Sequence, residues 1–182
     1  MSLNAMCLEV INFLNSDPNS YDEVTYMQKK NKIEAMKNVL NESLLGQKDR
    51  MLNSKDITGS YNIFVYYITL LEDHLTDEEF YNFSDKILLG KTNIIPNPIM
   101  CVLKSKHKLS KNLTLRVMNK IGQIKIDANN NVFGKFPYDY RYYLLKREEV
   151  PMDIKEEILE TYSRNEIAHI EEMDKTLILM KG

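Results

Sequence analysis

The sequence of 182 residues lacks the patterns that build disulfide-linked or membrane-spanning proteins. Its two cysteines, Cys7 and Cys101, form no C-x-x-C pair. Two lone thiols predict a reducing compartment rather than a disulfide framework. The longest nearly apolar run, Ile63 to Leu71, is too short to cross a bilayer. The N-terminus also lacks the basic start and apolar run of a signal peptide. We therefore expect a cytoplasmic, intracellular protein without a membrane partner.

Motifs for small ligands are missing as well. The three histidines, two cysteines and scattered carboxylates show no metal-ligand spacing, and there is no Gly-rich phosphate loop or nucleophile elbow. The sequence accordingly predicts no metal and no cofactor. Tryptophan is absent, and the wealth of Asn, Lys, Ile and Tyr is typical of AT-rich genomes, such as those of many viruses and phages.

Acidic residues are absent from one long stretch, because no Asp or Glu lies between Asp85 and Asp127. The segment from Lys86 to Lys125 carries nine lysines and arginines, whereas the rest of the chain has 15 basic and 26 acidic residues. Concentrated positive charge is typical of proteins that bind polyanions, because counterion release supplies most non-specific affinity. Alternatively, this basic block pairs with the acidic C-terminal third, residues 148–174. The candidate nucleic-acid contacts are Lys104, Lys106, Lys108, Lys111, Arg116, Lys120 and Lys125.

Apolar residues recur at helical spacing through most of the chain, which predicts a mainly α protein. We expect a bundle of six to eight helices in a single domain covering residues 1–182. The predicted helices span about 3–15, 20–45, 61–74, 76–90, 97–103, 110–121, 153–162 and 164–180. Capping boxes at Ser20, Thr76 and Ser163 mark three of their N-termini.

One segment carries a β signal. Residues 124–127 alternate with period two, turn residues occupy 128–131, and 132–136 could return as a partner strand. We expect a small β-hairpin over about residues 123–136.

The order helix, turn, helix at 110–121 and hairpin resembles a winged helix-turn-helix, which suggests a sub-lobe at 97–136. The resemblance implies that the second helix enters a major groove and that the hairpin contacts the backbone. Leu109, Leu113, Val117 and Ile121 recur every four residues and should face the core, which would leave Lys111, Arg116 and Lys120 outward. The alternative is an ordinary helical pair capped by a hairpin.

A short motif near the C-terminus carries the most specific chemistry. Arg164-Asn165-Glu166-Ile167-Ala168-His169 follows the capping Ser163, so Arg164 and Asn165 should lie in a first helical turn. A helix N-terminus favours phosphate, Arg supplies a bidentate phosphate contact, and His transfers protons near neutral pH. Five residues on an ideal helix rotate by about 500°, so Arg164 and His169 should lie about 140° apart. Another interpretation is a surface Arg and a partly buried His on an amphipathic helix.

The motif resembles the R-N-x-x-A-H signature of the HEPN superfamily of ribonucleases. The resemblance implies a metal-independent endoribonuclease of helical fold, usually a homodimer, with Arg164, Asn165 and His169 as catalytic residues. It also favours RNA over DNA as the partner. Two alternatives stay open: a non-enzymatic, winged-helix-like regulator that binds nucleic acid, and a helical viral or phage module that binds a host protein.

Overall fold

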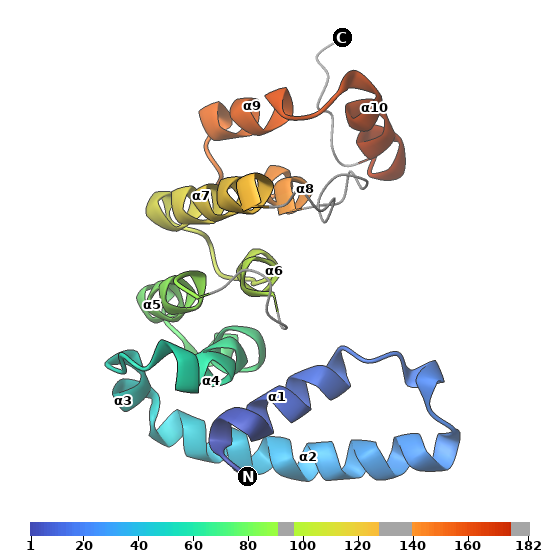
Figure 1. Cartoon of the computed structure of the whole chain (residues 1–182), viewed down its shortest axis with the longest axis vertical. Coiled ribbons are helices and arrows are strands. Elements are labelled where there is room, and N and C mark those ends of the chain that lie inside the picture. Colours follow the sequence, from blue (N-terminus) through green and yellow to red (C-terminus); the bar gives the residue numbers. More distant parts are fainter. Residues whose placement is uncertain (91–96, 128–139, 176–182) are drawn as a thin grey trace. The chain divides into compact units, whose positions relative to one another are not determined.

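The computed structural model describes residues 1–90, 97–127 and 140–175, with side chains described for all of these except 122–127 and 173. Throughout these ranges every regular element is a helix, so the prediction of a mainly α helical bundle is confirmed (Figure 1). The chain divides into two compact units, Met1–His107 and Lys108–Gly182, which we call unit 1 and unit 2. The boundary falls within the predicted sub-lobe at 97–136. The single domain and that sub-lobe stay predictions.

Unit 1 contains six α-helices and two short 3-10 helices among its described residues. They are α1 (Leu3–Leu14), η1 (Pro18–Ser20), α2 (Glu23–Gly46), α3 (Lys48–Leu52), α4 (Ile57–Leu70), η2 (Glu72–His74), α5 (Asp77–Leu88) and α6 (Pro98–Leu103). In unit 2 the described helices are α7 (Lys111–Asp127), α8 (Tyr140–Leu145), α9 (Met152–Glu160) and α10 (Arg164–Met173). The described α-helices outnumber the six to eight predicted because α3 and α8 are too short to show a helical period.

The core of unit 1 is built around α4, which packs against α1, α5 and α6. Because neighbours surround it, α4 carries apolar residues all round, which explains the run from Ile63 to Ile68 that resembles a strand locally. Phe64, Tyr66 and Tyr67 are fully buried. The ring of Tyr67 stacks on Phe83 of α5, with centroids 4.4 Å apart and planes at 6°. α2 packs along α1 and closes the other side of this core (Figure 1).

Local caps define where several helices begin. Thr76 and Ser163 form the predicted capping boxes at the starts of α5 and α10. The box predicted at Ser20 is wrong, because the Asp22 carboxylate caps α2 by accepting the Thr25 N–H at 2.9 Å. Ser20 instead ends η1 (Pro18–Ser20), and Asp is as good an N-cap as Ser.

The predicted hairpin over residues 123–136 is wrong in its first strand. Residues 124–127 are helical and belong to α7, which continues through Gly122, beyond the predicted helix end at 121. The spacing of Val117, Ile121 and Ile124 continues the helical period, and extending a helix adds one hydrogen bond per residue fixed. A four-residue alternation gives too little strand pairing to interrupt the helix. The predicted return strand, 132–136, lies outside the described residues.

Candidate functional site

The basic block is divided between the two units. Lys104 and Lys106 lie at the end of unit 1, and both are exposed. Lys108, Lys111, Arg116, Lys120 and Lys125 belong to unit 2. We therefore build the candidate nucleic-acid surface from unit 2 alone.

One face of α7 carries this surface. Leu109, Leu113, Val117 and Ile121 are all buried, which confirms the predicted apolar stripe. Outside this stripe Lys111 and Arg116 are exposed, and Lys120, which borders the stripe next to Leu113, is half-buried. Lys125 lies in the last turn of α7, but its side chain is not among those described.

The centre of the exposed α7 face is polar but uncharged. At 100° per residue, Lys111 and Lys120 lie about 180° apart, and Asn112 and Asn119 project midway between them. Both asparagines are exposed, and Leu115 between them is 46% exposed. Amides can donate to and accept from bases, while the cations on either side suit phosphates. α7 itself contains no acidic residue before Asp127.

Two contacts fix the start of α7. The Ser110 hydroxyl accepts the Leu113 N–H at 3.1 Å and so caps the helix. One residue earlier, Glu149 accepts the Leu109 N–H at 3.0 Å with the same carboxylate oxygen that accepts from Arg147 Nε at 2.7 Å. Burial alone would raise the pKa of Glu149, but these hydrogen bonds hold it below its usual value. Glu149 is therefore ionised at neutral pH and anchors α7 to the segment that follows α8.

The R-N-x-x-A-H motif occupies the first turns of α10. The Ser163 hydroxyl accepts the Glu166 N–H at 3.2 Å, and the Glu166 carboxylate accepts the Ser163 N–H at 2.7 Å. Arg164, Asn165 and His169 are all exposed, whereas Ile170 is fully buried and attaches the helix to the core of unit 2. His169 is thus not the partly buried histidine of the alternative interpretation.

The turn that precedes α10 is held by a residue that the sequence did not single out. Arg141 on α8 is 9% exposed, and its guanidinium donates to the Thr161 carbonyl at 3.2 Å and hydroxyl at 2.9 Å. The guanidinium carbon also lies 3.8 Å from the centre of the Tyr162 ring. These contacts fix residues 161–162, so Arg141 positions the N-terminus of α10. In the sequence, Arg141 lies between tyrosines, and this is the one local feature that favours a cation–π contact.

The α10 motif has acidic neighbours along the chain. Glu156, Glu157 and Glu160 on α9 are exposed, and Glu171 and Glu172 follow His169. These carboxylates repel phosphate, so α10 alone is a poor binding surface for a polyanion. Arg164 and His169, about 140° apart on one helix, also cannot meet on a single narrow face.

Two tyrosines of α8 contribute to the core of unit 2. Tyr140 and Tyr142 are buried, and the Tyr142 hydroxyl donates to Asp174 at 2.6 Å. Lys146 forms an ion pair with the same carboxylate at 3.1 Å. Tyr138 lies outside the described residues.

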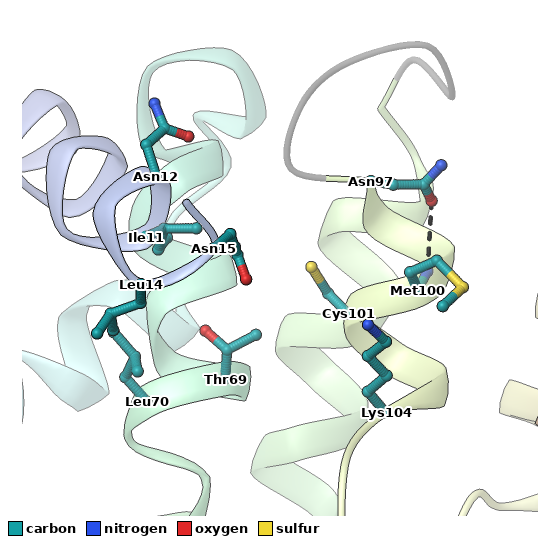
Figure 2. A pocket seen from close by; sticks show the side chains of 10 residues that line it. All are labelled: Ile11, Asn12, Leu14, Asn15, Thr69, Leu70, Asn97, Met100, Cys101 and Lys104. Atoms are coloured by element: carbon teal, nitrogen blue, oxygen red, sulfur yellow. Dashed lines mark hydrogen bonds between the residues drawn. The ribbon is translucent and has the colours of Figure 1, made fainter. Parts of the chain in front are cut away.

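Unit 1 contains a pocket of about 580 Å³ between the last turns of α1 and α4 and one face of α6 (Figure 2). Leu14, Leu70 and Asn15 line one side, and Cys101 and Lys104 reach toward them from α6. Lys104 is therefore a pocket residue as well as a predicted nucleic-acid contact. The C-terminal ends of α1 and α4, which carry partial negative charge, border the same pocket and offset the Lys104 ammonium. The lining thus selects neither an anion nor a cation.

The described residues show neither a metal cluster nor a membrane span. In the described ranges no group of three or more His, Cys, Asp or Glu side chains could hold a metal ion. None of the helices described is both long and apolar enough to cross a membrane. No protein-family model, curated protein or solved structure matches the chain.

Proposed function

We propose that this chain is a nucleic-acid-directed protein that contacts the phosphate backbone of RNA through the exposed face of α7. One observation carries the proposal: Lys111, Arg116 and Lys120 flank neutral amides on α7, which has no acidic residue before Asp127 at its end. Phosphate contacts of this kind release counterions and give affinity that falls steeply with salt. The fixed start of α7, at Ser110 and Glu149, keeps this face in one orientation.

More specifically, we propose a metal-independent, HEPN-like endoribonuclease with its catalytic groups on α10. Arg164 and Asn165 would hold and polarise the scissile phosphate at the helix N-terminus, and His169 would transfer protons to and from the reacting oxygens. The 2′-hydroxyl attacks the adjacent phosphorus, the 5′-oxygen leaves with a proton, and a 2′,3′-cyclic phosphate remains. The capped start of α10 and the exposure of all three side chains support this assignment.

The helix geometry favours a site built from two copies of the chain. Because Arg164 and His169 diverge by about 140° on α10, the Arg of one copy would meet the His of the other. In such a dimer, the cations of the two α7 helices would bind the RNA backbone and so offset its repulsion by the carboxylates near α10.

The first experiment is cleavage of a labelled RNA in EDTA. Wild type should cleave, and His169→Ala should lower the rate by about 10²–10⁴-fold, the usual contribution of a general acid or base. His74→Ala, an exposed histidine on η2, is the matched control and should keep full activity. If wild type and His169→Ala are equally inactive, the ribonuclease assignment is wrong.

Complementation tests the shared site. Arg164→Ala and His169→Ala should each be inactive, yet a mixed dimer keeps one intact pair of residues. Mixing equal amounts should therefore restore about a quarter of the wild-type rate, since half the dimers are mixed and each has one of two sites. An inactive mixture, in a protein that is active as wild type, would mean that each chain carries its own complete site.

A further inference from the structure

The segment that ends unit 1 is fastened to η2 and α5 by polar contacts. The Ser105 hydroxyl donates to the Glu72 carboxylate at 2.7 Å, and the Lys106 N–H reaches the same oxygen at 3.3 Å. The His107 N–H in turn donates to the Ser105 hydroxyl at 3.1 Å. These contacts hold residues 105–107, which lead directly to Lys108, the first residue of unit 2.

The His107 side chain makes the decisive contacts. Its Nε2 lies 2.7 Å from the Glu72 carbonyl oxygen, and its Nδ1 lies 2.8 Å from Asp77 Oδ1. The imidazole also stacks on Phe80, with centroids 4.7 Å apart and planes at 15°. The side chain is only 14% exposed, so water replaces these partners poorly.

Both ring nitrogens face groups that can only accept. A carbonyl oxygen has no proton to donate, and neither has an ionised carboxylate. A neutral imidazole carries a single N–H and can satisfy one of the two, whereas an imidazolium donates to both. The arrangement of acceptors around the ring therefore favours protonated His107.

The charged groups around the ring agree with this conclusion. Asp77 faces it from α5, the Glu72 carboxylate approaches from η2, and Phe80, which stacks on it, is uncharged. Burial by itself lowers the pKa of His107, but the hydrogen bonds and charges of Asp77 and Glu72 together raise it above its ordinary value.

We propose that His107 is a pH-sensitive switch that fastens the connector between the two units when its imidazole is protonated and loosens it when the proton leaves. Deprotonation leaves one acceptor without its donor. Asp77, with 78% of its side chain exposed, can take water instead, so the neutral ring should keep its bond to the Glu72 carbonyl. Loss of the Asp77 contact leaves the ring held only by the Glu72 carbonyl and the Phe80 stack among the contacts described, and so loosens the chain at Lys106 and Lys108. This switch is independent of the proposed ribonuclease activity.

Trypsin reports the state of the connector, because exposed lysines flank His107 on both sides. Cleavage after Lys106 and Lys108 is measured on the full chain from pH 6 to 8.5. Each rate is divided by that of a free peptide covering residues 103–112, which cancels the pH dependence of the protease. We expect the normalised wild-type rate to rise about tenfold through a midpoint above 6.5, the ordinary pKa of histidine.

Two variants make the result specific. His107→Gln should be cut quickly at every pH, because a neutral amide cannot donate to both acceptors strongly. Asp77→Asn keeps the histidine but removes the carboxylate, so the midpoint should move to lower pH. His74→Gln, an exposed histidine in the same unit, should behave as wild type. The proposal fails if the normalised wild-type rate is flat or falls with pH, or if Asp77→Asn leaves the midpoint unchanged.

Discussion

Removing the Glu149 carboxylate should loosen the start of α7 and destabilise unit 2. The carboxylate is 20% exposed and its partner Arg147 is 13% exposed, so the pair is largely shielded from water. One of its oxygens accepts both the Leu109 N–H and Arg147 Nε. Glu149→Ala would leave a buried amide N–H and a buried guanidinium without this acceptor.

The size of the effect follows from these contacts. Hydrogen bonds to a charged group contribute about 1.5–3 kcal/mol, and leaving a fully buried ion without its partner costs about 3–5 kcal/mol. Because both side chains keep some exposure to water, Glu149→Ala should lower the free energy of unfolding by about 2–3 kcal/mol. Glu149→Gln should cost about 1 kcal/mol, because its amide oxygen can still accept from Leu109 while the charge facing Arg147 is lost. For a chain of this length, 1 kcal/mol moves the melting temperature by about 2–4 °C.

The pH dependence of this contribution has a definite sign. The folded-state pKa of Glu149 is lowered, so the stabilisation is complete above its unfolded pKa of about 4.3 and disappears as pH falls through the folded value. Thermal unfolding followed by circular dichroism at pH 7, 5, 4 and 3 should show wild type and Glu149→Gln converging at the acid end.

The adjacent Glu148 provides the control. It is exposed, and Glu148→Gln should change the melting temperature by less than 1 °C. Equal effects of the two substitutions, or a Glu149→Ala protein as stable as wild type, would refute the role of Glu149 at the start of α7.

Three further outcomes are expected. Phe83→Ala removes the fully buried ring that stacks on Tyr67 and should lower the free energy of unfolding by about 3–5 kcal/mol in a denaturant titration; a loss under 1 kcal/mol would contradict the packing described. Ser163→Ala removes the cap of α10 and should cost about 1 kcal/mol, whereas Ser163→Asp, which keeps an acceptor, should cost less. Thiol labelling at pH 8 should modify Cys101 slowly and Cys7 only after unfolding. Burial raises the pKa of Cys101 to about 11 and that of the inaccessible Cys7 to about 12, so neither thiol ionises readily. Fast labelling of Cys7 would place it at the surface.

Features that depend on nearby residues could be predicted from the sequence. The capping boxes at Thr76 and Ser163 involve residues three positions apart, and the exposure of Arg164 and Asn165 follows from the second box. The buried stripe of α7 was equally evident, because four apolar residues at regular spacing need only one helix. The hairpin prediction was wrong for the converse reason: the alternation at residues 124–127 is short, and the helical period of α7 continues through it.

The contacts that give the sites their character could not be predicted, because they join distant parts of the chain. Arg141 meets Thr161, 20 residues further on, and His107 meets Glu72, 35 residues earlier. Nothing in the local sequence around His107 distinguishes it from His74, which is exposed. His107 meets its partners only when α6, η2 and α5 pack together, because that packing decides which carboxylates its side chain reaches.

The salt dependence of RNA binding tests the central claim that α7 is a nucleic-acid surface. Affinity for a labelled single-stranded RNA is measured by fluorescence anisotropy from 50 to 300 mM KCl, for wild type and for the triple variant Lys111→Gln, Arg116→Gln, Lys120→Gln. Each phosphate contact contributes about 0.7 to the slope of log affinity against log salt, so the variant should lose about 2 units of slope. The control variant Lys30→Gln, Lys55→Gln, Lys175→Gln, which removes the same charge from other exposed positions, should keep the wild-type slope. Wild-type binding that is absent or independent of salt, or an equal loss in both variants, would contradict the account.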